Sequence, residues 1–151
     1  MSQNPYKRDS EGSFIVSVGD ELPSFEFVTL NGDTLDSDFL RGQVCLIQFV
    51  ASWCPYGRGQ MKAVEDLIWR KFKKKYSDLT IIGFTEDFPQ DTAQFRNMDS
   101  EKGISYPFCF DVDEHVFKSF VTPHATVTRM VLVDRTGRIV ALEDEFYRKV
   151  L

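Results

Sequence analysis

The cysteine at position 54 has the surroundings that a reactive thiol requires. It follows an apolar run over residues 44–53, and Pro55, a residue suited to the first turn of a helix, comes directly after it. Unpaired backbone N–H groups and the helix dipole favour the thiolate form of a cysteine at a helix N-terminus. Such a thiolate attacks a disulfide, a peroxide or a sulfenic acid. The plainer alternative is that Cys54 is a partly exposed thiol without a reaction.

The other two cysteines, Cys45 and Cys109, are predicted to be buried and inert. Cys45 lies in the strand predicted just before Cys54, and at about 3.3 Å per residue the two are more than roughly 20 Å apart. A disulfide requires α-carbons within about 7 Å, so Cys45 is interpreted as a core residue. Cys109 lies between two phenylalanines in a short predicted strand, and the sequence leaves its distance from Cys54 open. Because the three cysteines are an odd number, a purely paired disulfide framework is excluded.

Two further side chains could act on the Cys54 thiol. Arg58, one helical turn beyond, would add positive charge, although an arginine facing solvent is the commoner outcome. His124, in the segment 122–125, could tune the thiol or act as a base, although a loop histidine in water is commoner. His115 is expected at the surface. Two histidines and three scattered cysteines show no metal-ligand spacing, so neither a metal nor a cofactor is expected.

Charge and hydropathy exclude several kinds of partner. The formal net charge of −5 argues against nucleic acid, which requires a clustered positive surface. The basic run 70–75 could bind an anion, but cations are favoured at a helix C-terminus, so we expect a solvated helix end. No apolar run reaches the roughly 18–20 residues of a membrane span. Residues 1–12 lack the apolar core of a signal peptide, which indicates a cytoplasmic protein or a chain that begins after a removed leader.

The apolar pattern predicts strands that alternate with helices. The segment 43–51 has apolar residues on both parities, which is typical of a strand covered on both faces. A helix begins at Pro55, and its apolar residues recur at spacings of three and four: Met61, Val64, Ile68 and Phe72. The other predicted elements are strands at 25–28, Leu79–Thr85, 106–110, 130–133 and 138–142, a turn at 31–33, helices at 89–98 and 111–120, and a helical tail at 143–151. Residues 1–17 are predicted to be a flexible segment and residues 18–151 a single domain.

The order of these elements, with Trp53-Cys54-Pro55 where a central strand meets a helix, resembles the thioredoxin superfamily. Other stretches are more narrowly similar to its extracytoplasmic thiol-disulfide oxidoreductase branch, which is related to the alkyl hydroperoxide reductase group. They are residues 18–25 (VGDELPSF), the Asn31-Gly32 turn with residues 40–42 (LRG), residues 49–54 (FVASWC), and residues 131–134 (VLVD) followed by Gly137. The similarity covers roughly residues 18–143, and together these motifs are specific for the fold.

The resemblance implies an α/β fold, a three-layer sandwich with a mixed central sheet and helices on both faces. It also implies that Cys54 is the catalytic thiol and that Trp53 and Tyr56 flank it. Partners would be protein thiols or disulfides, with a low-molecular-weight thiol as a further possibility. An extracytoplasmic, periplasmic location is favoured by the resemblance alone.

Three positions around this site depart from the family pattern. Gly57 stands where the second cysteine would lie, so an attacked substrate has no internal thiol to release it. Gln48 stands where thioredoxins carry a buried acid, and a neutral amide cannot shuttle a proton in the same way. Thr128 stands where the family places a cis-proline. A cis peptide bond before any residue other than proline costs about 2.5–4 kcal/mol, so a trans bond is expected before Thr128.

The sequence therefore predicts a thioredoxin-like redox protein that acts through the single thiol of Cys54. One alternative is a weak thiol peroxidase, although Ala51 replaces the threonine that peroxide-reducing relatives carry. Another is a degenerate thioredoxin fold that binds polypeptides in a groove beside Trp53, Tyr56 and Thr128. Gly57 could also be a substitution introduced to trap substrates.

Overall fold

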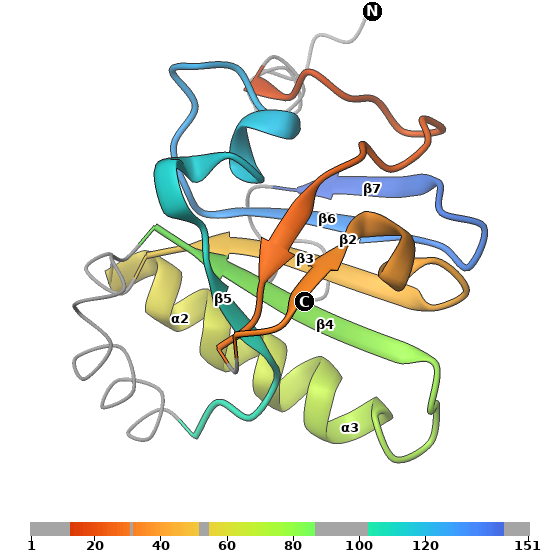
Figure 1. The fold of residues 1–151 in the computed structure, drawn as a ribbon. Helices are drawn as coiled ribbons and strands as arrows, with labels where there is room; N and C mark the ends of the chain where they lie inside the picture. The colour runs from red at the N-terminus through yellow and green to blue at the C-terminus, as the bar shows by residue number, and fades with distance from the viewer. Residues whose placement is uncertain (1–12, 31, 52–54, 87–102, 144–151) are drawn as a thin grey trace, which may run out of the picture.

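The structure is a computed structural model that describes residues 13–30, 32–51, 55–86 and 103–143. The strands of its central sheet are β3 (Val44–Val50), β4 (Leu79–Thr85), β5 (Phe108–Phe110), β6 (Arg129–Val133) and β7 (Ile139–Glu143). They lie in the order β5–β4–β3–β6–β7 (Figure 1). β3, β4 and β5 are parallel, and β6 and β7 are antiparallel to their neighbours. The predicted mixed sheet is confirmed.

β3 occupies the centre of this sheet because its residues are apolar on both faces. It pairs with β4 on one side and β6 on the other, and every residue from Cys45 to Val50 is buried. The predicted strand at 43–51 is thus confirmed to within one residue at each end. β4 has the predicted bounds.

Among the described residues, one continuous helical segment covers one face of the sheet. It runs through α2 (Pro55–Val64), the π-helical turn η2 (Glu65–Trp69) and α3 (Arg70–Phe72). Met61 and Val64 are completely buried against the sheet, as the apolar spacing predicts. The π turn was not predicted. At this turn Glu65 is fully buried, and its carboxylate accepts hydrogen bonds from the Arg70 guanidinium at 3.1 Å and the Ser105 hydroxyl at 2.8 Å.

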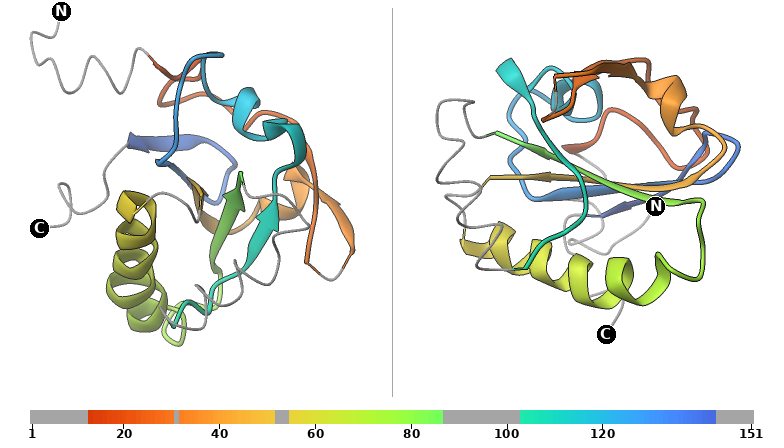
Figure 2. Two further views of the ribbon diagram at one scale, coloured as in Figure 1. Left: turned by 90° about the vertical axis from the view of Figure 1, so that its left-hand side faces the viewer. Right: turned by 60° about the horizontal axis from the view of Figure 1, so that its bottom comes forward.

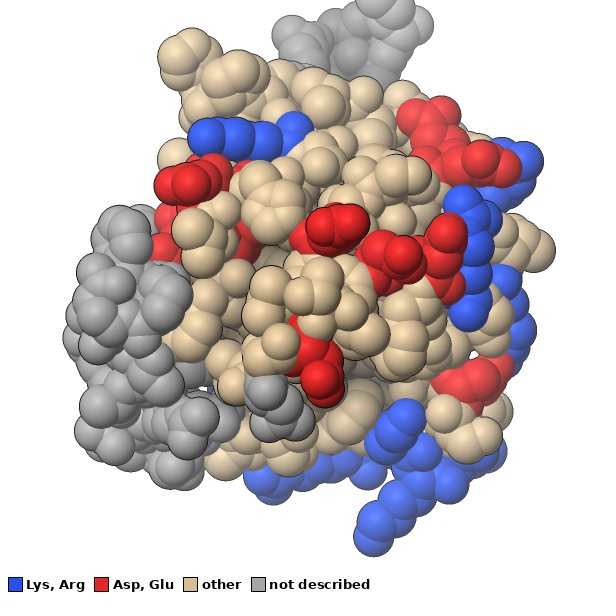
Figure 3. Space-filling view, in the orientation of Figure 1, with Lys and Arg blue, Asp and Glu red and all other residues tan. Residues whose placement is uncertain are grey.

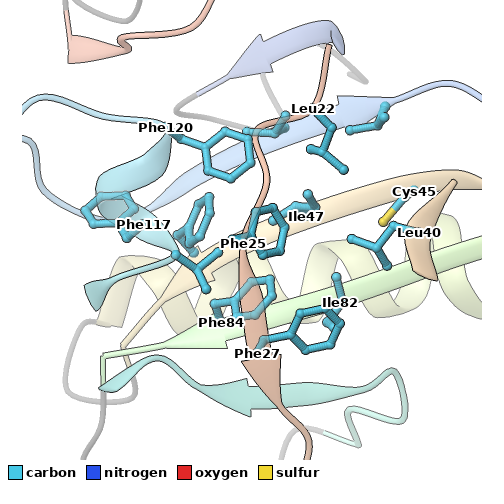
Figure 4. Packing of buried hydrophobic residues seen from close by; sticks show 14 of the residues in the cluster. Leu22, Phe25, Phe27, Leu40, Cys45, Ile47, Ile82, Phe84, Phe117 and Phe120 are labelled. Carbon is cyan, nitrogen blue, oxygen red and sulfur yellow. The ribbon is translucent and has the colours of Figure 1, made fainter. Parts of the chain in front are cut away.

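The other face is covered by a hairpin and short 3₁₀ helices (Figure 2). β1 (Glu26–Val28) and β2 (Thr34–Asp36) form the antiparallel hairpin, followed by η1 (Ser37–Leu40). β2 was not predicted, because its three residues alternate exposed and half-buried and carry little apolar signal. Aromatic rings fill the space between the hairpin and the sheet (Figure 4). Rings in contact at centroid distances of 5.0–6.1 Å include Phe25, Phe27, Phe49, Phe84, Phe117 and Phe120.

The helix predicted over 111–120 is wrong as a single element. The structure has two 3₁₀ helices there, η4 (Val112–Glu114) and η5 (Phe117–Ser119). The Asp111 carboxylate accepts the backbone N–H groups of Val116 and Phe117 at 3.0 and 2.9 Å, and Asp113 has φ +57°. These side chain-to-backbone bonds compete with the α-helical pattern that the spacing of apolar residues indicates.

The described part of the predicted flexible segment packs on the domain. Phe14 is buried in the aromatic cluster and forms a β-bridge with Val121, and the Ile15 N–H donates to the Phe120 carbonyl at 2.8 Å. Phe14 and Ile15 therefore contact the segment that follows η5. Residues 1–12, the helix predicted at 89–98 and all but the first residue of the helix predicted at 143–151 lie outside the described residues. Glu143, that first residue, is instead the last residue of β7. None of the helices in the described ranges is both long and apolar enough to cross a lipid bilayer.

Candidate active site

The predicted reactive position lies between the end of β3 and the start of α2. Trp53 and Cys54 are outside the described residues, but both elements that flank them are described. β3 ends at Val50, and α2 begins at Pro55, the residue that directly follows Cys54. Pro55, Tyr56 and Gly57 form the first turn of this helix. The elements around position 54 are therefore those that the sequence predicts: a buried strand before it and a helix N-terminus after it.

The carboxyl ends of the parallel strands meet at the edge of the sheet where β3 ends (Figure 1). The Glu86 N–H donates to the Val50 carbonyl at 2.9 Å, and the Asp111 N–H donates to the Thr85 carbonyl at 2.9 Å. Two carboxylate residues thus follow β4 and β5 at this edge, where α/β proteins place their binding sites. Burial raises the pKa of Asp111, against the opposing effect of the two N–H groups that bind its carboxylate.

Thr128 lies at the same edge, and the expected geometry of its peptide bond is wrong. The Val127–Thr128 peptide bond is cis. The trans expectation rests on the local preference of the peptide bond, whereas tertiary structure sets the position of Thr128. Thr128 is buried, and it leads directly into β6, where Arg129 pairs with Phe49. Its hydroxyl oxygen finds no hydrogen-bond partner within the described residues.

Arg58 and His124, the two predicted modulators, differ in exposure. Arg58 is half-buried in the first turn of α2, whereas His124 is exposed in the loop before β6. His115, predicted at the surface, is exposed, and its Nε2 lies 2.6 Å from the Glu26 carbonyl oxygen. The described ranges contain no group of histidines, cysteines and carboxylates that could hold a metal ion.

Gln48 is completely buried in β3, and its partner was not found by sequence reasoning. The Tyr106 hydroxyl donates to Gln48 Oε1 at 2.6 Å. Gln48 Nε2 has no hydrogen-bond partner among the residues that the structure describes. Where the resemblance implies a buried acid, this chain therefore has a neutral amide bound to a phenol. Tyr106 lies far from Gln48 in sequence, so no local spacing could have indicated the pair.

Cys45 and Cys109 are both buried, as predicted. Cys45 is 0% exposed and Cys109 1% exposed, and both belong to the aromatic cluster (Figure 4 shows Cys45). Burial raises the pKa of each thiol to about 12. At this pKa, neither sulfur supplies an appreciable amount of thiolate near neutral pH.

The mixed sheet, the strand-to-helix junction at position 54 and the loop that leads into β6 define a thioredoxin-like protein. A protein-family model described as Redoxin matches residues 17–149, so the chain belongs to the Redoxin family.

Individual relatives agree with this assignment. Thioredoxin-like protein YneN of Bacillus subtilis strain 168 is 26% identical over 111 residues, which are 72% of this chain and 62% of that protein. A solution structure from Bacteroides thetaiotaomicron, described as a candidate protein disulfide isomerase, is 33% identical with a TM-score of 0.77, covering 87% of this chain and 81% of that one. The thioredoxin domain of a thiol-disulfide oxidoreductase from Bacteroides vulgatus has a TM-score of 0.71 at 22% identity, covering 89% and 96%.

The comparisons confirm the predicted thioredoxin-like fold and the thiol-disulfide oxidoreductase family. The chain spans about three fifths of the length of its curated relative YneN.

Proposed function

We propose that this protein catalyses thiol-disulfide exchange through Cys54 alone. The observation that carries the proposal is the contrast between the three cysteines. α2 begins immediately after Cys54, whereas Cys45 and Cys109 are buried with their pKa raised to about 12. A helix N-terminus stabilises a thiolate, and the interior of the sheet suppresses one.

The exchange begins when the Cys54 thiolate attacks one sulfur of a substrate disulfide. A bond forms between Cys54 Sγ and that sulfur, the substrate S–S bond breaks, and the second substrate sulfur leaves as a thiolate. Gly57 has no sulfur with which to attack this mixed disulfide. An external thiolate must therefore attack it, which forms a new disulfide and returns Cys54 to its thiolate form. A low-molecular-weight thiol or a partner protein thiol would supply this step.

The proposed chemistry supports the compartment and the substrate class that the resemblance implies. Protein disulfides persist in oxidising compartments and are rare in the cytosol. We therefore place the protein outside the cytoplasm, with protein thiols and disulfides as its partners. This location is consistent with the resemblance of the sequence to the extracytoplasmic branch of the family.

A peroxidase reaction at Cys54 has less support. Ala51, the residue that directly follows β3, is completely buried and carries no hydroxyl that could orient a peroxide oxygen. A polypeptide-binding module without chemistry is the remaining alternative. The adduct experiment described next distinguishes both alternatives from thiol-disulfide exchange.

The test offers the reduced protein an excess of 2-hydroxyethyl disulfide or of hydrogen peroxide and follows the intact mass. We expect a single mixed-disulfide adduct, mapped to Cys54, that persists until a thiol is added. Cys54→Ser is the control and forms no adduct. A faster reaction with peroxide would indicate the peroxidase, and the absence of any adduct would indicate the binding module.

A second variant tests the missing internal step. In Gly57→Cys, the introduced thiol can attack the mixed disulfide and release the substrate. We expect this variant to gain reduction of insulin disulfides when a reductant is supplied. If Gly57→Cys reacts no faster than the parent protein, the absent second thiol is not what limits turnover.

A further inference from the structure

The basic run at residues 70–75 borders an apolar cavity, which the sequence did not indicate. The cavity has a volume of about 320 Å³ and lies at the first residues of β3 and β4, opposite the end of the sheet where Cys54 follows β3. Its lining is nearly all apolar and comes from both sheet and helix: Val44, Ile68, Phe72, Tyr76 and Leu79. Tyr76 is 44% exposed at the mouth.

Three cations lie beside this cavity: Arg135 is part of its lining, and Lys71 and Lys75 lie next to rings that line it. On the helix side, Lys71 Nζ lies 5.3 Å from the centre of the Phe72 ring, and Lys75 Nζ lies 5.4 Å from the centre of the Tyr76 ring. Across the cavity, the turn between β6 and β7 contributes Arg135, whose side chain is 61% exposed. Figure 3 shows lysine and arginine side chains gathered along this lower edge of the molecule.

Two other cations of the same run are engaged elsewhere. Arg70 binds the buried Glu65 carboxylate, and Lys73 Nζ donates to the Leu79 carbonyl at 2.8 Å. The anion at the cavity is Asp78, which pairs with Arg135. Because both partners are exposed to solvent, this pair holds Arg135 only weakly, and the guanidinium can also bind a second carboxylate. The rim therefore carries a surplus of positive charge on a protein whose net charge is −5.

We infer that the cavity is a docking site for an acidic polypeptide segment that carries one bulky apolar side chain. The apolar side chain would fill the cavity, and flanking carboxylates would bind Lys71, Lys75 and Arg135. Separated cations on two sides fit several separated carboxylates better than one charged head group. A lipid surface fits less well, because the apolar residues here line a recess and do not project from the protein. The inference does not depend on the chemistry of Cys54.

The test measures fluorescence anisotropy of a labelled peptide of aspartate and glutamate with one central tryptophan. We expect the double variant Lys71→Glu/Lys75→Glu to bind this peptide about tenfold or more weakly, because the rim then repels carboxylates. Replacing the tryptophan of the peptide with alanine should weaken binding to the parent protein. Added salt should weaken it also, because exposed charges are screened.

The matched control is Lys62→Glu/Lys118→Glu, which changes the net charge equally at residues that are not next to the aromatic rings of the cavity. Lys62 is half-buried and pairs with Asp66, and Lys118 is exposed. We expect the control to bind nearly as well as the parent, and both variants to form the Cys54 adduct at the parental rate. The proposal would be overturned if the two double variants lost peptide affinity equally, or if the peptide with alanine in place of tryptophan bound as tightly as the original. So would an absence of peptide binding together with lysine-dependent co-sedimentation on phosphatidylglycerol vesicles, which would indicate a membrane surface.

Discussion

The sulfur atoms of this chain occupy two contrasting regions, the interior of the sheet and the junction after β3. Cys45 lies within β3, where Thr80 of β4 pairs with it on one side and Val133 of β6 on the other. Cys54 follows the same strand after its last paired residue, immediately before α2. One strand thus leads from a buried thiol whose pKa is raised to the position at which we propose a thiolate. The position along the strand, and not the cysteine itself, decides the chemistry.

The largest expected effect is in thiol reactivity. A thiol with a pKa of about 12 is ionised to about one part in ten thousand at pH 8, whereas a free cysteine near 8.5 is ionised to about a quarter. We expect iodoacetamide to label Cys54 at least about 1,000-fold faster than Cys45 or Cys109 in the native protein. Peptide mapping measures the three rates, and unfolding in guanidinium should equalise them. Comparable native rates would remove the contrast between the two regions.

The next effect separates stability from activity. Cys45→Ser places a hydroxyl in an apolar site, and we expect it to lower the free energy of unfolding by about 1–3 kcal/mol. Cys54→Ser should change it by less than about 0.5 kcal/mol and abolish the mixed-disulfide adduct. Urea unfolding measures the free energy of unfolding, and intact mass measures the mixed-disulfide adduct. If Cys54→Ser proved the more destabilising, position 54 would belong to the core.

Tyr106→Phe tests the hydrogen bond between Tyr106, before β5, and Gln48, in β3 between the two regions. The change leaves Gln48 Oε1 without its donor, and we expect a loss of about 1–2 kcal/mol in the free energy of unfolding. In a Gln48→Leu background the same change should cost much less, since the bond is already absent. An equal cost in both backgrounds would show that Tyr106 contributes through packing.

The smallest effect concerns Asp111 at the site edge of the sheet. Burial raises its pKa in the folded protein, so the folded state binds a proton more tightly than the unfolded state. Its contribution to stability is then present at low pH and is lost as the pH rises through the folded pKa. Asp111→Asn should therefore lower stability relative to the parent at acidic pH more than at neutral pH. Urea unfolding across this pH range checks the sign, and the opposite trend would contradict it.

Much of the central fold could be predicted because its signals are local. The apolar residues of β3 and β4 occur on both parities, which indicates strands buried on both faces, and Pro55 marks the start of α2. The apolar spacing also identified the buried face of that helix. These elements also predict the edge of the sheet at which the candidate site lies, because parallel strands place their carboxyl ends together.

What the sequence could not predict depends on contacts between distant residues. The Tyr106–Gln48 hydrogen bond joins β3 to the segment before β5, and Glu65 binds Ser105 from a turn whose π geometry has no sequence signature. The cis bond before Thr128 likewise opposes the local preference of the dipeptide. In the segment after β5, apolar spacing indicated one helix, whereas the Asp111 carboxylate binds the backbone inside it.

The most direct test of the account is the pH dependence of Cys54 alkylation in the native, reduced protein. Iodoacetamide labelling is followed across the pH range, and the Cys54 peptide is quantified by mass spectrometry. We predict a rate midpoint clearly below about 8.5, the value of a free cysteine, with almost no label on Cys45 or Cys109. A midpoint at or above about 8.5, or label that accumulates first on a buried cysteine, would contradict the account.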